Sequence, residues 1–279
     1  MADNETTVPS FRPVVGVVGA GQLARMMWPP AVELDIDLRL LAARGTDSAA
    51  RVIPATMVGD ERGLADLERF AAGLDVLTFD HEHVPTAHLH TLESGGVRVR
   101  PGPHALPYAT DKAVMRRGLR EAGFAVPSFE VIESVDDLPS AVEKVGGWPV
   151  VLKTARGGYD GRGVWVAESV EQASDAFAAR VPVVVEERVP FVRELAALVA
   201  RAPSGQAVSY PVVESVQRDG NCVEVLAPAP GLSEQTSIAA QRLARDVAAT
   251  VDVVGVLAAE LFELEDGSVL VNELAMRPH

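Results

Sequence analysis

The chain has 279 residues, of which 48% are apolar and 23% are charged, the composition of a folded globular protein. Its net charge of −14 argues against a nucleic-acid groove and against an anionic membrane surface. The single cysteine, Cys222, excludes an internal disulfide, and no apolar run is as long as a membrane span. We therefore expect a cytoplasmic protein with neither a membrane nor a nucleic acid as partner.

The first half of the chain alternates between strands and helices. Residues 1–13 are polar and contain two prolines, so we expect a flexible arm rather than an export signal. The pattern after them predicts three strands (Val14–Val18, Asp37–Ala42, Asp75–Phe79) and three helices (Arg25–Leu34, Gly63–Ala72, Thr86–Ser94). Such alternation is typical of an α/β domain with a parallel sheet, here a Rossmann-like domain over residues 14–107. We place its boundary in the proline-rich segment Pro101–Pro107.

The turn after the first strand, Gly19–Ala24, fits the outline of a dinucleotide fingerprint. A NAD site also requires an acidic residue about 20 positions later, and the chain has Ala42-Ala43-Arg44 there. Arg44 could contact a 2′-phosphate, so the sequence is compatible with an NADP site. A tight strand-to-helix turn without a ligand explains the glycines equally well.

The second half, residues 108–279, is richer in strands and reads as α+β. It opens with a helix at Asp111–Ala122, where we expect Arg116, Arg117 and Arg120 to lie on a solvated face. Six strands and one long helix are predicted after it: Pro149–Lys153, Gly163–Ala167, Pro182–Glu187, Glu194–Ala200, Ala207–Glu214, Asn221–Ala227 and the helix Gln235–Val251.

A glycine-rich segment runs from Lys153 to Gly163 between two of these strands. It contains four glycines in seven residues together with one lysine and two arginines. Backbone amides of such a loop can surround a phosphate, and the cations can neutralise it. The alternative is an ordinary hairpin loop. Further on, the strand Val183–Glu187 runs into a second carboxylate and an apolar residue, which suits a purine nucleoside or, equally, a strand that ends in solvated charge.

Two carboxylates face each other in the hairpin predicted at the end of the chain. Its strands are Gly255–Leu264 and Ser268–Ala275, and Asp266-Gly267 predicts a two-residue loop. This register places Glu260 opposite Glu273, where like charges about 5 Å apart repel by roughly 3 kcal/mol at an effective dielectric constant near 20. A bridging Mg²⁺ would relieve the repulsion. Solvation of both carboxylates at a wet strand edge is the alternative.

These features occur in the order found in ATP-grasp ligases. Four sequence segments resemble those of the N5-carboxyaminoimidazole ribonucleotide synthetase family in particular: Gly21–Met26, Phe79–Pro85, Gly157–Gly163 and Asn272–His279. The resemblance covers nearly everything after residue 13. It implies a Rossmann-like domain followed by an ATP-grasp domain, with a lid at about 113–190 and an antiparallel core at about 191–279.

The family implies a reaction and a set of residues for it. ATP would phosphorylate bicarbonate to carboxyphosphate, and the amine of 5-aminoimidazole ribonucleotide (AIR) would capture the carboxyl group in purine biosynthesis. The resemblance assigns ATP to Lys112, Lys153, Gly158, Tyr159, Asp160, Gly161, Arg162, Gly163, Val164, Glu186, Glu187, Arg188, Val189, Glu194, Gln217, Asn272 and Glu273. It assigns the metal, Mg²⁺ with Mn²⁺ as an alternative, to Glu260 and Glu273. It assigns AIR and bicarbonate to Glu82, Tyr159, Asp160, Arg162, Arg277 and His279, and it implies a homodimer.

The chain departs from the family pattern in three places. It has Asp80-His81-Glu82 where relatives often have Glu-Phe-Glu, and Gln217 where a histidine often stands. The family motif continues past His279 into a C-terminal domain, which we expect to be missing, so the core is incomplete. Two alternatives therefore stay open: a different ATP-grasp ligase or carboxylase, and a truncated nucleotide-binding fragment without turnover.

Overall fold

The structure is a computed structural model that describes residues 12–158, 162–218 and 220–279. The contacts divide the chain between Arg100 and Pro101 into two compact units.

The first unit is built on a four-stranded parallel sheet. Its elements are β1 (Val14–Val18), α1 (Gln22–Glu33), β2 (Asp37–Ala42), β3 (Thr56–Val58), α2 (Leu64–Ala71), β4 (Val76–Phe79) and α3 (Thr86–Ser94). The strand order is β3-β2-β1-β4, and all pairs are parallel. The predicted parallel α/β arrangement is confirmed. The helix α1 begins three residues earlier than predicted, and the short strand β3 was not predicted.

The glycine turn between β1 and α1 already has a partner within the protein. The Gly21 N–H, at the N-terminus of α1, donates to Asp80 Oδ2 at 2.5 Å. Gly19 has a φ of +107°, and a Cβ there would lie 1.7 Å from Asp80 Oδ1. The glycines are thus required by the approach of a buried carboxylate. A carboxylate at this position would repel a phosphate, and Arg44 is paired with Asp47 at 3.0 Å, so the structure does not support the dinucleotide interpretation.

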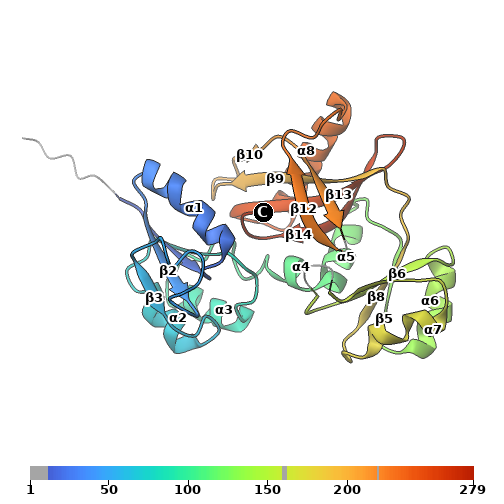
Figure 1. Cartoon of the computed structure of the whole chain (residues 1–279), viewed down its shortest axis with the longest axis horizontal. Helices are drawn as coiled ribbons and strands as arrows, with labels where there is room; N and C mark the ends of the chain where they lie inside the picture. Colours follow the sequence, from blue (N-terminus) through green and yellow to red (C-terminus); the bar gives the residue numbers. More distant parts are fainter. Residues whose placement is uncertain (1–11, 159–161, 219) are drawn as a thin grey trace, which may run out of the picture. The chain divides into compact units, whose positions relative to one another are not determined.

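The second unit begins with helices and a small antiparallel sheet. Its elements up to residue 187 are α4 (Pro107–Thr110), α5 (Lys112–Glu121), β5 (Phe129–Ile132), α6 (Leu138–Lys144), β6 (Val150–Thr154), β7 (Val164–Ala167), α7 (Val170–Ala173) and β8 (Val183–Glu187). The strand order is β5-β8-β6-β7. Figure 1 shows α6 and α7 on one side of this sheet, where Leu138, Val142, Leu152 and Val185 form part of its core.

A larger antiparallel sheet follows, with one long helix packed on it. Its elements are β9 (Arg193–Arg201), β10 (Ala207–Ser209), β11 (Val213–Arg218), β12 (Asn221–Leu226), α8 (Glu234–Thr250), β13 (Gly255–Glu263) and β14 (Val269–Ala275). The order is β12-β11-β9-β13-β14, and β10 also pairs with β9. The helix α8 packs on β9 and β13, as Figure 1 shows. The α+β prediction is confirmed, although the predicted strand 207–214 is two strands.

The hairpin β13–β14 pairs Glu260 with Glu273, as predicted, but it reaches this register by another route. Its loop has three residues, Glu265–Gly267, because the Leu264 N–H donates to Ser268 O and Gly267 adopts a φ of +80°. The predicted two-residue loop is wrong. The register shifts again between Glu260 and Leu261, which pair with Glu273 and Val271 and leave Asn272 as an extra residue. The two shifts cancel, so the two carboxylates still face each other.

In the described part of the chain, no helix combines the length and the apolar character that crossing a membrane requires.

Candidate nucleotide-binding site

Two lysines from different elements reach the carboxylate of Glu273. Lys112, the first residue of α5, lies 2.7 Å from Glu273 Oε1, and Lys153 on β6 lies 3.9 Å from the same oxygen. Asp111 caps α5 through the amides of Ala113 and Val114, and its other oxygen pairs with Arg156 at 2.6 Å. The start of the glycine-rich segment is thereby held next to Lys112.

The extra residue in β14 explains how two consecutive side chains reach one lysine. In a regular strand, successive side chains point to opposite faces. Here Lys153 Nζ donates to Asn272 Oδ1 at 2.8 Å and also lies 3.9 Å from Glu273 Oε1. The β-bulge at Asn272 turns both side chains toward the same ammonium group. No residue pattern in the sequence predicts this bulge.

Glu186 on β8 is buried between two cations. Lys153 Nζ lies 3.0 Å from Glu186 Oε2, and Arg116 Nε lies 2.6 Å from Glu186 Oε1. Burial acts to raise the pKa of Glu186, but the charges of Lys153 and Arg116 and their hydrogen bonds outweigh it and lower this pKa to about 2. Arg116 is fully buried, so the prediction that it lies on a solvated face is wrong. Arg117 and Arg120 on the same helix are exposed, because only one side of α5 packs against the strands.

Three carboxylates share one face of the large sheet. Glu194 is the register partner of Phe262, two residues from Glu260, and Glu260 pairs with Glu273. Burial raises the pKa of Glu194, and the negative charge of Glu260 raises it further. Burial also acts to raise the pKa of Glu273, but the charges of Lys112 and Lys153 outweigh it and lower the value. The lysines thus relieve part of the expected repulsion between the facing carboxylates.

The donor set on this face fits a magnesium ion that is shared with a phosphate. Glu260 and Glu273 offer carboxylate oxygens from paired positions, and Asn272 lies beside them. No cluster of three or more acidic, histidine or cysteine ligands is found in the residues described. Mg²⁺ is commonly held by only one or two carboxylates, and substrate phosphates and water complete its coordination. The residues therefore fit Mg²⁺ when a nucleotide supplies the remaining oxygens.

The end of β8 and the segment after it connect the two sheets of the second unit. Glu187 uses its carboxylate to accept the Ser128 N–H at 2.7 Å, Arg188 is exposed, and Val189 is buried. Beyond them, Phe191 stacks on Phe262 with ring centroids 4.5 Å apart. Since Phe262 shares a face with Glu194, a flat apolar surface lies next to this carboxylate. The sequence alone does not predict this aromatic pair, because Phe191 and Phe262 are far apart along the chain and meet only through the packing of β13.

Part of the glycine-rich segment lies outside the described residues, including Tyr159, Asp160 and Gly161. Of the remainder, the Thr154 N–H donates to Gly163 O at 2.9 Å. Arg162 and Val164 are exposed. A Cβ on Gly158 would lie 2.8 Å from Arg162 O, so the two sides of the segment approach closely there.

The remaining predicted residues lie at several places. His279 Nε2 lies 3.3 Å from Glu260 Oε1, which brings it to the carboxylate face, and Arg277 donates to Pro278 O. Gln217 is partly buried in β11, opposite Cys222. Glu82 lies in the first unit, three residues after β4.

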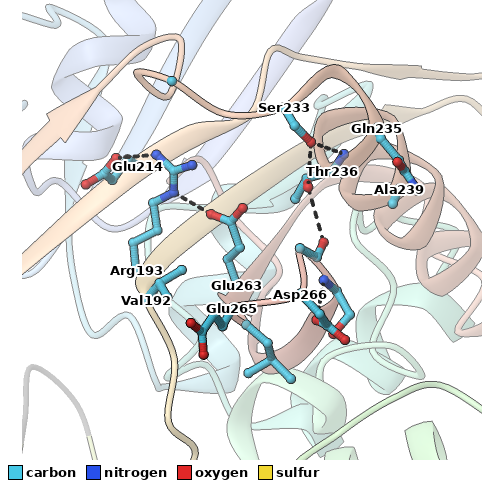
Figure 2. A pocket seen from close by; sticks show the side chains of 14 residues that line it. Val192, Arg193, Glu214, Ser233, Gln235, Thr236, Ala239, Glu263, Glu265 and Asp266 are labelled. Atoms are coloured by element: carbon cyan, nitrogen blue, oxygen red, sulfur yellow. Dashed lines mark hydrogen bonds and ion pairs between the residues drawn. The ribbon is translucent and has the colours of Figure 1, made fainter.

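A cavity of about 790 Å³ lies on the opposite face of the large sheet, as its lining residues show. Arg193 directly precedes Glu194, and Glu263 directly follows Phe262. Because successive side chains of a strand point to opposite faces, Arg193 and Glu263 point away from the carboxylate face. Figure 2 shows Arg193 paired with both Glu263 and Glu214, and Ser233 and Thr236 at the start of α8. The carboxylates of Glu214 and Glu263 neutralise the positive charge of Arg193. This cavity is distinct from the lysine–carboxylate cluster, which consists of Lys112, Lys153, Asn272 and Glu273.

Comparison with known families identifies the class. Residues 13–110 match the model of the ribonucleotide synthetase preATP-grasp domain, and residues 117–279 match that of the ATP-grasp domain. Fold and lysine–carboxylate cluster together thus define a protein of the ATP-grasp class.

Individual relatives narrow the class to one family. N5-carboxyaminoimidazole ribonucleotide synthase of Mycobacterium tuberculosis is 53% identical over 98% of this chain and 64% of its own length. The protein of the same name from Brucella melitensis is 34% identical over 95% of this chain and 74% of its own length. The chain belongs to the N5-carboxyaminoimidazole ribonucleotide synthase family. It spans about two thirds of the length of the curated mycobacterial relatives.

Solved structures agree with this assignment. The carboxyaminoimidazole ribonucleotide synthase of Aspergillus clavatus complexed with ATP has a TM-score of 0.88 and 32% identity, over 96% of this chain and 71% of that one. A structure described as the synthase of the same fungus in complex with ADP and AIR has a TM-score of 0.87, 31% identity and coverage of 96% and 70%.

Proposed function

We propose that the chain binds Mg-ATP at the lysine–carboxylate cluster. As part of its full gene product, it would catalyse the ATP-dependent carboxylation of AIR by bicarbonate. The products would be N5-carboxyaminoimidazole ribonucleotide, ADP and phosphate. The observation that carries the proposal is the meeting of Lys112, Lys153, Asn272 and Glu273, which come from three elements and contact one another within hydrogen-bond or ion-pair distance.

The cluster suits the phosphates of ATP. Lys112 and Lys153 are held at Glu273 and supply the positive charge that phosphoryl transfer requires. The amides of the glycine-rich segment, Gly158–Val164, would cover the phosphates. When bound, Mg²⁺ would neutralise phosphate charge between Glu260 and Glu273, and Mn²⁺ could replace it.

The nucleoside would lie where the two sheets of the second unit are joined. The backbone of Glu186–Val189 would frame the adenine, and Glu194 would accept hydrogen bonds from the ribose hydroxyls. Burial and the negative charges of Glu260 and Glu273 raise the pKa of Glu194 more than Lys153 lowers it, and hydroxyl donors would satisfy this carboxylate. The Phe191–Phe262 pair offers an apolar surface to the base. Gln217 would be a further nucleotide contact.

The chemistry requires two successive transfers. A bicarbonate oxygen attacks the γ-phosphorus of ATP, ADP leaves, and carboxyphosphate forms. The AIR amine then attacks the carboxyl carbon, the bond from this carbon to the phosphate oxygen breaks, and inorganic phosphate leaves with a proton lost from the amine. Carboxyphosphate hydrolyses readily, so the glycine-rich segment must exclude water during the reaction.

The residues toward AIR and bicarbonate remain predictions of the family resemblance. They are Glu82, Tyr159, Asp160, Arg162, Arg277 and His279. A homodimer is a prediction of the same kind, whereas a cytoplasmic location is predicted from the composition of the chain. The two structures of the Aspergillus clavatus relative, described as complexes with ATP and with ADP and AIR, support the choice of ligands.

The test is the release of ADP by the full gene product that contains this chain. With Mg-ATP and bicarbonate present, addition of AIR should increase ADP release, and the product should contain carbon from labelled bicarbonate. A gene product that releases no ADP with AIR is not this ligase. ADP release that responds to another amine, but not to AIR, would instead favour a different ATP-grasp ligase.

A nucleotide-binding fragment without turnover is the second candidate, because the chain spans only 64% of the mycobacterial relative. Calorimetry on the 279-residue chain would support it if Mg-ATP binds and no ADP forms.

A further inference from the structure

Arg116 is the one fully buried arginine in the described part of the chain. It lies on α5, one turn after Lys112. Its Nε lies 2.6 Å from Glu186 Oε1, and its Nη1 donates to Val271 O at 3.1 Å. Its Nη2 is buried and has no hydrogen-bond partner among the residues described. A buried guanidinium with an unsatisfied N–H is expensive, so its presence calls for an explanation.

The contacts of Arg116 form a closed ring of interactions that includes Lys153 and Asn272 of the lysine–carboxylate cluster. Arg116 pairs with Glu186, Glu186 with Lys153, and Lys153 with Asn272, whose neighbour Val271 returns to Arg116. The members come from α5, β8, β6 and β14. The strands β6 and β8 belong to the small sheet and β14 to the large sheet, so the ring connects the two sheets.

Arg116 also changes how much of the charge of Lys153 remains available. Ion pairs join Lys112, Lys153 and Arg116 to Glu186 and Glu273, and Glu194 and Glu260 lie on the same face of the large sheet as Glu273. Without Arg116 this group would lose one positive charge, and Lys153 would be the only cation on Glu186. A more negative group would attract the phosphates of a nucleotide less strongly.

The second contact of Arg116, to Val271 O, holds the β-bulge. Val271 directly precedes the extra residue Asn272, and β14 is the last strand of the large sheet. On its outer edge, the Val271 N–H donates to Ala125 O at 2.9 Å and its carbonyl accepts from Arg116. Both backbone groups at the start of the bulge are therefore fixed by α5 and the segment after it.

We propose that Arg116 is a positioning residue for nucleotide binding. By holding Glu186 and Val271 together, it shares the negative charge of Glu186 with Lys153 and keeps Asn272 and Glu273 turned toward the ammonium group of Lys153. The inference rests on the proposed Mg-ATP function of the same cluster. Arg116 itself makes its contacts to the protein.

The test compares Mg-ATP dissociation constants, measured by calorimetry, for the wild-type chain and for Arg116→Met. This substitution keeps much of the apolar volume and removes the charge. We expect the dissociation constant to rise about tenfold or more, since one partner of a buried ion pair is removed. Arg117→Met, on the exposed side of the same helix, is the matched control and should bind as the wild type does.

A double variant separates positioning from a merely structural role. In Arg116→Met with Glu186→Gln, the uncompensated carboxylate is gone and Lys153 is released. We expect the affinity for Mg-ATP to recover severalfold relative to Arg116→Met alone. If affinity does not recover, or if Arg116→Met binds as the wild type does, the proposal is wrong.

A conservative variant and a separate activity measurement complete the test. Arg116→Lys keeps the charge but cannot reach Glu186 and Val271 O together, so it should fold and bind with an affinity between the wild type and Arg116→Met. If Arg116→Met does not fold, this variant decides, and wild-type affinity in it overturns the proposal. AIR-dependent ADP release reports on the proposed ligase function separately. A wild-type chain that does not bind Mg-ATP would overturn both.

Discussion

Lys153 is the residue on which the candidate site depends most. Its side chain is almost fully buried, and its Nζ contacts Asn272, Glu186 and, at a longer distance, Glu273. A buried charge is costly unless an opposite charge is paired with it. Glu186 and Glu273 pair with Lys153, and a phosphate would find a cation that is already in place.

At this scale, Glu273→Gln is the sharpest test of the metal assignment. The amide keeps the shape but removes a negative ligand, so turnover of the full gene product should fall by about 100-fold or more while the fold persists. Glu265→Gln, in the exposed hairpin loop, is the control. Turnover should be measured over a range of Mg²⁺ and Mn²⁺ concentrations. Normal turnover in Glu273→Gln would contradict the assignment.

Glu186 should make stability depend on pH in a defined window. Its pKa of about 2 in the folded state lies below the ordinary value of 4.5, so the folded form binds this proton less readily than the unfolded form. The contribution to stability is complete above pH 4.5 and is lost as the pH falls toward 2. It amounts to about 3 kcal/mol.

Urea unfolding of the wild type and of Glu186→Gln between pH 7 and pH 2.5 measures this contribution. The difference in unfolding free energy between the two proteins should shrink below pH 4.5 and stay constant above it. A difference that is constant over the whole range would show that Glu186 does not titrate as described.

At the scale of elements, the hairpin β13–β14 places the carboxylates through two irregularities that compensate each other. The three-residue loop shifts the register by one position, and the bulge at Asn272 shifts it back. Loss of either one alone would turn Glu273 away from Glu260, because a shift of one residue moves side chains to the other face. The register at the site therefore depends on a bulge that Arg116 holds from outside the strand.

The glycine-rich segment gives an element-scale prediction with an internal control. Gly157 and Gly163 have φ values of +78° and +77°, so alanine is strained at both positions. A Cβ at Gly163 would also lie 2.5 Å from Thr154 Oγ1, whereas none of the described atoms lies within 4 Å at Gly157. Gly163→Ala should therefore weaken Mg-ATP binding several times more than Gly157→Ala in calorimetry. Equal effects would mean that strain in φ, and not the contact with Thr154, limits the segment.

At the scale of the whole molecule, the predicted nucleotide residues and Glu82 belong to different compact units. The residues that contact one another in the cluster all lie after Pro101, and the first unit contributes a parallel sheet with Glu82 after β4. This division suggests that nucleotide binding and AIR dependence can be changed separately.

Glu82→Gln should test that separation in the full gene product. We expect unchanged affinity for Mg-ATP in calorimetry and loss of the increase in ADP release on addition of AIR. Glu68→Gln, on an exposed position of α2, should leave both unchanged. Reduced Mg-ATP affinity in Glu82→Gln would show that the first unit takes part in nucleotide binding.

The sequence by itself determined the alternation of β1, α1, β2 and β4 and the presence of the hairpin β13–β14. These features follow from apolar periodicity and from turn residues, which depend on neighbouring residues. The pairing of Glu260 with Glu273 was predicted from a two-residue loop, but a three-residue loop and the bulge at Asn272 produce it. Only the tertiary structure decided that Asp80 occupies the glycine turn, that Asn272 forms a bulge and that Arg116 is buried. Arg116 meets Glu186 and Val271 across 70 and 155 residues, and Lys153 meets Asn272 across 119. Such contacts arise when the two sheets pack together, and the pattern of neighbouring residues in the sequence does not predict them.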